Sequence, residues 1–130
     1  MNDRTPINTS AAPATIGPYN QAIVASGFVF ASGQTPIVPG SGDLIRGDIS
    51  VQARQVFENL NAVLDAAGSG LDRALHVRVY LRRMEDFEAM NAVYASFVPE
   101  PHPARTTVAV AGLPKDAKIE IDVIALAGPR

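Results

Sequence analysis

An arginine and a glutamate stand out near the end of the chain because both lie in segments that are otherwise mild and apolar. Residues 102–110 read HPARTTVAV, with Arg105 before the apolar run, and residues 118–127 alternate in polarity and include Glu120. A guanidinium group can bind a carboxylate through two parallel hydrogen bonds, and a carboxylate can position water or move a proton. The two residue types therefore suit chemistry on a small carboxylic acid.

The alternation of side chains along a strand decides whether these two groups can meet. In residues 105–110, Val108 and Val110 are expected to face the core, which leaves Arg105 and Thr107 on the other side. In residues 118–124, Ile119, Ile121 and Val123 are expected to face the core, which leaves Glu120 on the other side as well. We therefore expect Arg105 and Glu120 to share the sheet face that no helix covers. Periodicity alone favours a solvated face with a surface ion pair over a binding site.

Two segments have the apolar spacing of amphipathic helices. The first covers residues 51–67, where Asp48 or Ser50 can cap the start and Gly68 can end the helix in a left-handed conformation. The second covers residues 85–97, and its apolar stripe is formed by Phe87, Met90, Tyr94 and Phe97.

Five strands are predicted from apolar or alternating runs bounded by turn residues. They cover residues 21–24, 28–32, 75–81, 105–110 and 118–127. The third alternates most regularly, with core-facing positions at Leu75, Val77, Val79 and Leu81. The order β-β-α-β-α-β-β indicates an α+β fold with two helices on one face of a sheet. Residues 1–130 are expected to form a single domain, with residues 1–13 as a loosely ordered N-terminal tail.

The composition excludes some classes of function and disfavours others, although a local basic patch could exist despite the balanced net charge. The 11 basic and 13 acidic residues give a net charge of −2, which offers no electrostatic attraction to nucleic acid. The chain has no cysteine, so disulfides, thiolate nucleophiles and cysteine-ligated metals are excluded. No apolar run approaches the roughly 20 residues needed to cross a bilayer, and the first residues lack the apolar core of a secretory signal. We expect a cytoplasmic protein without membrane contact.

Several separated segments carry a family resemblance. They are IGPYNQA at residues 16–22, ASGQ at 31–34, MEDF at 84–87, MNAVY at 90–94, PAR at 103–105 and LPKDAKIEI at 113–121. In this order and spacing they resemble the RidA (YjgF-type) family of imine deaminases. The similarity covers nearly the whole chain after residue 10, and the C-terminal segment is its most specific part.

The resemblance implies a chorismate-mutase-like domain that forms a homotrimer through its sheets, with the helices outside and three active sites at subunit interfaces. It also implies a 2-iminobutanoate/2-iminopropanoate deaminase. Such enzymes hydrolyse reactive 2-imino acids, which arise from enamines such as 2-aminoacrylate, to 2-oxo acids and ammonia. This hydrolysis needs no metal and no organic cofactor.

Residue roles follow from the resemblance position by position. Arg105 is expected to bind the substrate carboxylate, and Glu120 to position and activate water. Further substrate-binding positions are expected at Tyr19, Ser32, Gly33, Asn91 and Thr107. Many family members have cysteine where this chain has Thr107, so no thiol chemistry carries over, and we expect this position to influence substrate preference.

Simpler interpretations stand beside these roles. Tyr19 could anchor a strand start, Gly33 could form a bulge, and Asn91 could satisfy a buried backbone group. For the whole chain, the alternatives are a non-enzymatic regulatory trimer that binds carboxylates and, less favoured because of the charge balance, a translation-inhibiting ribonuclease. Loss of turnover with retained binding in a Glu120→Gln variant would favour the enzyme over the regulator.

Overall fold

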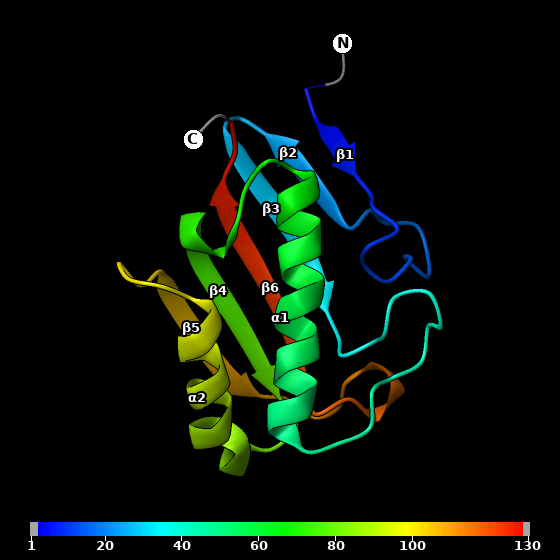
Figure 1. The fold of residues 1–130 in the computed structure, drawn as a ribbon, viewed down its shortest axis with the longest axis vertical. Coiled ribbons are helices and arrows are strands. Elements are labelled where there is room, and N and C mark those ends of the chain that lie inside the picture. Colours follow the sequence, from blue (N-terminus) through cyan, green and yellow to red (C-terminus); the bar gives the residue numbers. More distant parts are fainter. Residues whose placement is uncertain (1–2, 129–130) are drawn as a thin grey trace.

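A six-stranded mixed sheet and two α-helices make up residues 3–128, the part of the chain that the computed structural model describes (Figure 1). The strands are β1 (Thr5–Ile7), β2 (Ala22–Ala25), β3 (Phe28–Gln34), β4 (Ala74–Leu81), β5 (Ala104–Ala109) and β6 (Ile119–Leu126). The helices are α1 (Ile49–Ala66) and α2 (Phe87–Phe97), and three short 3₁₀ turns are η1 (Leu71–Arg73), η2 (Met84–Asp86) and η3 (Pro114–Asp116).

The strands are arranged in the order β1-β2-β3-β6-β4-β5. All neighbours are antiparallel except β4 and β5, which run parallel. A parallel pair needs a long crossover, and α2 supplies it between β4 and β5. This topology puts β6, the last strand in the chain, in the middle of the sheet and leaves β5 at an edge.

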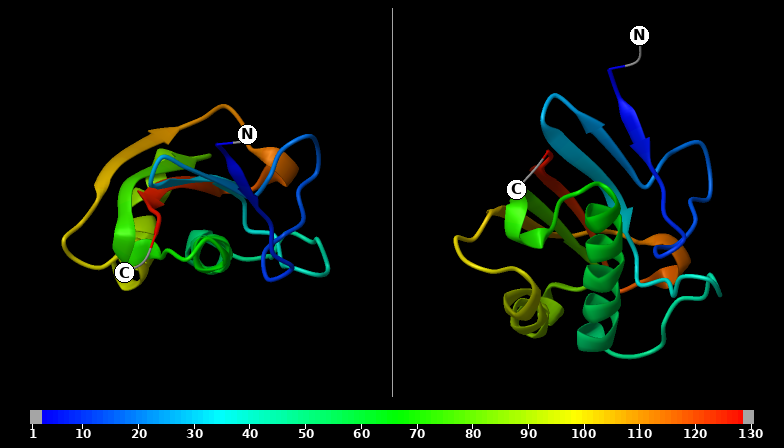
Figure 2. Two further views of the ribbon diagram at one scale, coloured as in Figure 1. Left: turned by 90° about the horizontal axis from the view of Figure 1, so that it is seen from above. Right: turned by 45° about the horizontal axis from the view of Figure 1, so that its top comes forward.

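Both helices pack on one face of the curved sheet, as the view from above shows (Figure 2). The core lies between these two layers and is filled mainly by aliphatic side chains with one central aromatic residue, Phe57. The Phe57 ring contacts the rings of Tyr94 and Phe97, which joins α1 to α2. The predicted α+β class, with two helices on one sheet face, is confirmed.

Residues 3–13, the described part of the predicted loose tail, are held in a defined conformation, and residues 1 and 2 lie outside the described residues. The described part contains β1, which pairs with β2, and it buries Ala12 in the core. The reason is Gln21, a buried side chain whose amide nitrogen donates to the carbonyls of Thr9 and Pro13. Its Oε1 accepts from the Thr9 N–H at 2.7 Å. One buried amide thus fixes a segment that has little apolar periodicity of its own.

The ends of α1 follow the residues that were expected to set them. The Asp48 side chain accepts a hydrogen bond from the Val51 N–H at 3.1 Å, so Asp48, and not Ser50, is the N-cap. Gly68 follows the helix with φ of 73°, in the left-handed region. Both features satisfy backbone groups that a helix end leaves without partners.

The prediction for β4 is right at three positions and wrong at one. Val77, Val79 and Leu81 are buried, whereas Leu75 is 39% exposed. The ladder between β4 and β6 has an irregularity between Ala74 and His76, which takes Leu75 out of the alternation.

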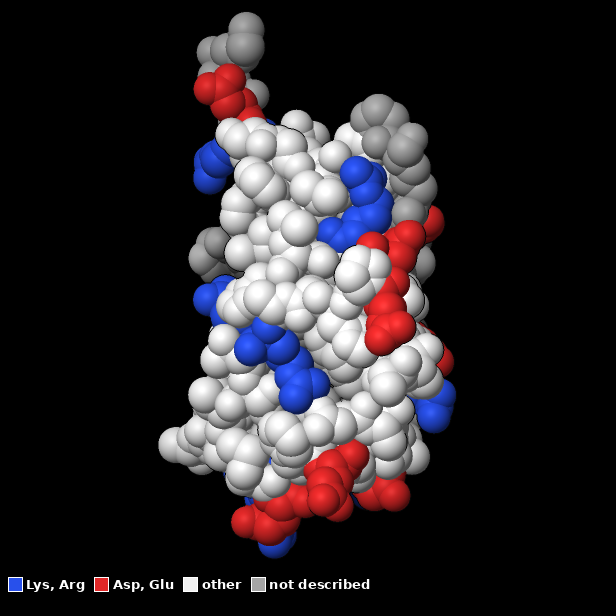
Figure 3. All heavy atoms as spheres, turned by 90° about the vertical axis from the view of Figure 1, so that its left-hand side faces the viewer, with Lys and Arg blue, Asp and Glu red and all other residues white. Residues whose placement is uncertain are grey.

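Charged side chains on the β5 and α2 side of the molecule lie in small groups separated by uncharged surface (Figure 3). This distribution agrees with the small net charge of the sequence. Within residues 3–128, neither α1 nor α2 is long and apolar enough to span a membrane.

Candidate functional site

Arg105 lies on the helix-covered face of the sheet, which corrects the expectation from side-chain alternation. In the parallel ladder it pairs with Val77, which is fully buried beneath the helices. Val108, which was expected to point into the core, is 39% exposed on the other face. The alternation of β5 is therefore opposite to the predicted one, because the half-buried positions of this edge strand hold Arg105 and Thr107.

The Arg105 guanidinium is held by groups of α2. Its Nη1 donates to Asn91 Oδ1 at 2.7 Å, and its Cζ lies 4.7 Å from the centre of the Tyr94 ring and 5.6 Å from that of Phe87. A cation between aromatic rings is stabilised electrostatically, and these contacts compensate for the burial of the arginine stem. Within residues 3–128, Arg105 forms no ion pair with a carboxylate.

A pocket of about 350 Å³ opens beside this guanidinium. It is lined by Asn91, Tyr94, Ala95, His102, Pro103 and Arg105. The pocket therefore offers an anion a planar guanidinium that is already oriented. The remaining N–H donors of this guanidinium are not engaged by any carboxylate of the described residues. Asn91 and Arg105, both expected at the substrate site, lie side by side, and Asn91 acts here as the acceptor that orients the guanidinium.

Glu120 lies on the opposite, helix-free face. It pairs across the ladder with Tyr80, which in turn pairs with Val108 on β5. Glu120 contributes to a larger pocket of about 680 Å³. This pocket is lined by Ile16, Tyr19, Ala31, Ser32, Gly33, Thr35, Ile37, Arg78, Pro114, Lys115, Glu120 and Asp122.

The pKa of Glu120 is raised above its ordinary value, first because the carboxyl is partly buried and second because Asp122 adds negative charge nearby. Its carboxylate receives no hydrogen bond from the described residues. In Asp122, by contrast, both carboxylate oxygens accept a hydrogen bond: Oδ1 from Arg78 Nε at 2.7 Å and Oδ2 from the Tyr80 hydroxyl at 3.0 Å. Glu120 is thus the carboxylate of this face that is available to bind and exchange a proton.

The backbone at Ser32 and Gly33 makes room for Glu120. The ladder between β3 and β6 is irregular between Ala31 and Gln34, so the predicted bulge is present. A Cβ added at Gly33 would lie 2.9 Å from Glu120 Cδ and would overlap a carboxylate oxygen. The Ser32 hydroxyl donates to the Asn20 carbonyl at 2.7 Å and so fixes the adjacent loop. The bulge expected at Gly33 is therefore present, while its part in substrate binding stays a prediction.

Tyr19 stands at the rim of the Glu120 pocket and is half exposed. Its hydroxyl accepts a hydrogen bond from the Ile16 N–H at 3.4 Å. This contact stabilises the turn before β2, as the simpler interpretation of Tyr19 expected, and the side chain also lines the pocket.

Thr107 lies two residues after Arg105 on the same, helix-covered face, where it pairs with Val79. Its Oγ1 is buried and is the one buried side-chain nitrogen or oxygen of the described residues that has no hydrogen-bond partner. A buried hydroxyl without a partner is costly, so this position has unused hydrogen-bonding capacity next to the guanidinium.

The predicted site residues thus fall into two groups on opposite sheet faces. Tyr19, Ser32, Gly33 and Glu120 lie together, and so do Asn91, Arg105 and Thr107. Alternation alone did not identify Asp122 and Arg78 as part of the first group, although the spacing Glu120-x-Asp122 places both carboxylates on one strand face. No group of three or more histidine, aspartate or glutamate side chains within residues 3–128 is arranged to hold a metal ion.

Comparison with known proteins gives consistent matches. A family model described as "Endoribonuclease L-PSP" matches residues 9–127. A RutC family protein of Pyrococcus horikoshii is 52% identical over 119 residues, which cover 92% of this chain and 94% of the relative. The chloroplastic Reactive Intermediate Deaminase A of Arabidopsis thaliana is 40% identical, covering 92% of this chain and 64% of the relative.

A solved structure adds a match in three dimensions. TdcF of E. coli with bound serine superimposes with a TM-score of 0.89 at 38% identity, covering 95% of this chain and 99% of the other. The similarity extends over both groups of candidate site residues.

Proposed function

The chain belongs to the RidA (YjgF-type) family, whose family model is described as endoribonuclease L-PSP, and on this premise we propose that it is a hydrolytic deaminase of reactive 2-imino acids. The reaction converts a 2-imino acid and water into a 2-oxo acid and ammonia, by hydrolysis of a C=N bond. Substrates of this class include 2-iminobutanoate and 2-iminopropanoate. A relative named Reactive Intermediate Deaminase A and a structural neighbour that binds serine, an amino acid, support a substrate with an α-carboxylate.

The observation that carries the proposal is the guanidinium of Arg105. It is oriented by Asn91 and two aromatic rings and has no carboxylate partner among the described residues. A fixed planar cation of this kind is suited to bidentate binding of a substrate carboxylate. Thr107 lies on the same strand face, and its buried hydroxyl has no hydrogen-bond partner among the described residues, so we expect this position to influence substrate preference.

Glu120 would carry out the proton transfers. An imine carbon is already electrophilic, so the enzyme mainly has to orient the substrate and a water molecule. The Glu120 carboxylate takes a proton from water as the oxygen bonds to C2 of the protonated imine, and the C=N π electrons move to the nitrogen, which becomes a neutral amine. Glu120 then gives this proton to the amine, the C–N bond breaks to release ammonia, and the C2 hydroxyl loses its proton to solvent as the C=O bond of the 2-oxo acid forms. The raised pKa of the Glu120 carboxyl makes it a better proton acceptor than an ordinary glutamate, and the same group can return the proton.

One subunit alone separates the two groups, because Arg105 and Glu120 lie on opposite sheet faces. We therefore propose a homotrimer in which the β5 edge of one subunit meets the helix-free face of the next, bringing Arg105 of one chain to Glu120 of another. The helix-free face supports this assembly because it exposes apolar side chains: Phe28, Phe30, Val108 and Leu126 are each 37–45% exposed.

RNA cleavage, the activity in the description of the family model, is less well supported by this site. The Glu120 pocket contains two cationic side chains, Arg78 and Lys115, and two carboxylates, Glu120 and Asp122. Such a balanced pocket does not attract a polyanion.

The test is a coupled assay in which a purified pyridoxal-phosphate-dependent dehydratase acts on threonine or serine while 2-oxo acid release is followed. We expect this protein to accelerate release, and Arg105→Ala to abolish the acceleration. Glu120→Gln should retain binding of a 2-oxo acid but lose turnover. A wild type that binds 2-oxo acids without accelerating release would instead indicate a carboxylate-binding regulator.

A further inference from the structure

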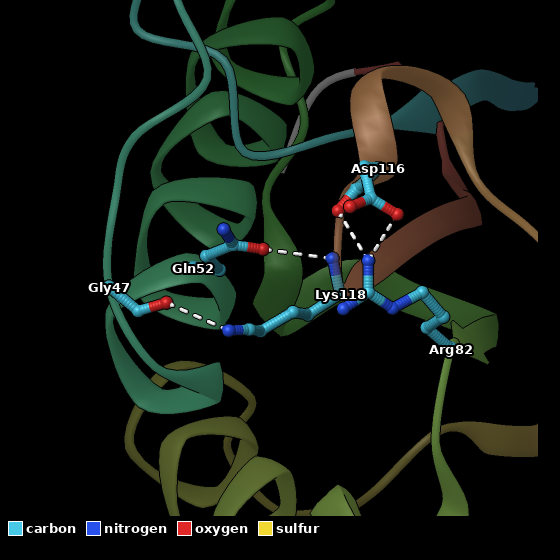
Figure 4. A network of polar contacts seen from close by, with 5 residues as sticks. All are labelled: Gly47, Gln52, Arg82, Asp116 and Lys118. Atoms are coloured by element: carbon cyan, nitrogen blue, oxygen red, sulfur yellow. Dashed lines mark hydrogen bonds and ion pairs between the residues drawn. The ribbon is translucent and has the colours of Figure 1, made fainter.

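We propose that the chain has a second, separate site, which binds the phosphoryl group of a phosphorylated small molecule. The site is a hollow of about 900 Å³ between the loop that precedes α1, the end of β4 and the η3 turn. It is lined by Asp43, Leu44, Ile45, Arg46, Gly47, Gln52, Arg82, Lys115, Asp116 and Lys118. Figure 4 shows the polar contacts at its centre.

The charge of this hollow differs in sign from that of the whole chain. It contains four cationic side chains, Arg46, Arg82, Lys115 and Lys118, and two carboxylates, Asp43 and Asp116, so its local charge is 4 − 2 = +2. The chain as a whole has a net charge of −2. A phosphoryl group carries a charge of about −1.5 to −2 near neutral pH, which matches the local excess.

Three of the four cations have donors to spare. Lys118 Nζ donates to the Gly47 carbonyl at 3.2 Å, and Lys115 Nζ donates to the Gly42 carbonyl at 2.9 Å. A carbonyl oxygen is neutral, and an ammonium group has three N–H donors, so each lysine keeps its full charge and further donors. Arg46 forms no ion pair within residues 3–128, and only Arg82 is paired, with Asp116.

The donors are held in place by a buried amide. Gln52, which is 4% exposed, accepts from the Lys118 backbone N–H at 2.9 Å and donates to the Ile45 carbonyl at 3.1 Å. It therefore ties the start of β6 to the loop before α1, as Figure 4 shows for Lys118. Gly47 lies in the same loop at φ of 150°, where a Cβ would lie 2.7 Å from Val51 Cβ. The carbonyl that orients the Lys118 ammonium thus depends on a glycine.

The site is distinct from the proposed active site, since neither Arg105 nor Glu120 lines it. Lys115 is the one side chain that lines both this hollow and the Glu120 pocket. Binding here can therefore be measured without turnover, and the result does not depend on whether the chain is a deaminase.

The experiment is a calorimetric titration of the full chain with inorganic phosphate, at constant ionic strength. We expect saturable binding that Arg46→Gln and Lys118→Met each weaken by roughly tenfold, since each removes a charge-assisted contact. Arg54→Gln is the matched control, because Arg54 is exposed on α1 outside the hollow, and it should bind as the wild type does. Circular dichroism checks the fold of the Lys118→Met variant.

Two results would overturn the proposal. One is the absence of saturable binding by the wild type. The other is an affinity that Arg54→Gln lowers as much as Arg46→Gln does, because this would indicate nonspecific attraction to positive charge. Arg46 is exposed and forms no ion pair within residues 3–128, so we expect Arg46→Gln to fold even if Lys118→Met does not. If the first result is accompanied by binding of an RNA oligonucleotide, the hollow is a nucleic-acid site instead.

Discussion

Arg105 and Glu120 lie on opposite faces of one sheet, separated by the strand that pairs with both of their strands. On β4, Val77 pairs with Arg105 and Tyr80 pairs with Glu120. Side chains alternate between the two faces along a strand, so Val77 and Tyr80, three positions apart, point to opposite faces, and so do their partners. If both residues act on one substrate, they come from two different subunits. The proposed chemistry therefore requires an oligomer in which two subunits meet at each site, as the proposed trimer provides.

A shared site predicts complementation between inactive variants. Arg105→Ala and Glu120→Gln should each be inactive alone. After the two proteins are mixed, unfolded and refolded together, random trimers should regain roughly a quarter of the wild-type activity, because one interface in four combines an intact Arg105 with an intact Glu120. The coupled 2-oxo acid assay measures the recovery. Activity that stays at the level of the single variants would show that the two residues do not share a site across subunits.

Substitution of Gly33 should displace Glu120 without unfolding the protein. A methyl group at Gly33 overlaps the end of the Glu120 side chain, which is flexible enough to move. We expect Gly33→Ala to lower kcat/KM by about a hundredfold, as small displacements of reacting groups do, and to leave the circular dichroism spectrum unchanged. Gly112→Ala is the control, since a Cβ there meets nothing within 4 Å. Equal activity in the two variants would argue against a catalytic Glu120.

The N-cap of α1 gives a prediction about stability. Asp48→Ala should lower the free energy of unfolding by about 1 kcal/mol, because the Val51 N–H loses its acceptor. Ser50→Ala, two residues further along, should change it by less than about 0.5 kcal/mol. Urea unfolding at one protein concentration compares the two variants. A larger effect for Ser50→Ala than for Asp48→Ala would show that Asp48 is not the N-cap of α1.

Helices and central strands were predictable from the sequence because their apolar spacing reflects burial on one side. The β5 alternation was not, because it depends on α2: the Phe87 and Tyr94 rings and the Asn91 amide make the helix side acceptable for Arg105. An edge strand has only one neighbour to enforce its alternation, so a valine such as Val108 can be left exposed.

The site residues were predictable by family resemblance, but their division between two faces was not. The defined conformation of residues 3–13 was likewise not predictable from periodicity. It depends on the Gln21 side chain, which donates hydrogen bonds to backbone carbonyls 8 and 12 residues earlier. Such a contact leaves no periodic pattern in the sequence.

Thr107 should show a trade-off between stability and binding. Thr107→Val keeps the shape of the side chain and removes a buried hydroxyl that has no partner. We expect the free energy of unfolding to rise by about 1 kcal/mol, and KM to rise by up to about tenfold if the hydroxyl contacts the substrate. Thr106→Val, on the exposed side of β5, should change neither quantity appreciably. A destabilised Thr107→Val variant would mean that another subunit supplies a partner for the hydroxyl.

The raised pKa of Glu120 predicts two pH dependences. Because the folded state holds this proton more tightly than the unfolded chain does, its contribution to stability is fully present below the unfolded pKa and is lost as the pH rises through the folded pKa. Glu120→Gln should therefore unfold with a flatter pH dependence in this window. Activity should run the other way and rise through the same pKa, since the ionised carboxylate takes the proton from water.

Substitution of Asp122 should lower the pKa of Glu120. Burial is the larger cause of the shift and the Asp122 charge the smaller one, so Asp122→Asn should move the acidic limb of the kcat/KM profile to lower pH without bringing it to the ordinary glutamate range. Asparagine can still accept the hydrogen bond from Arg78, which preserves the local geometry. Asp65→Asn, exposed on α1 and far along the chain, is the charge-matched control. A limb that stays in place in Asp122→Asn, or moves equally in Asp65→Asn, would show that Glu120 does not control the rate.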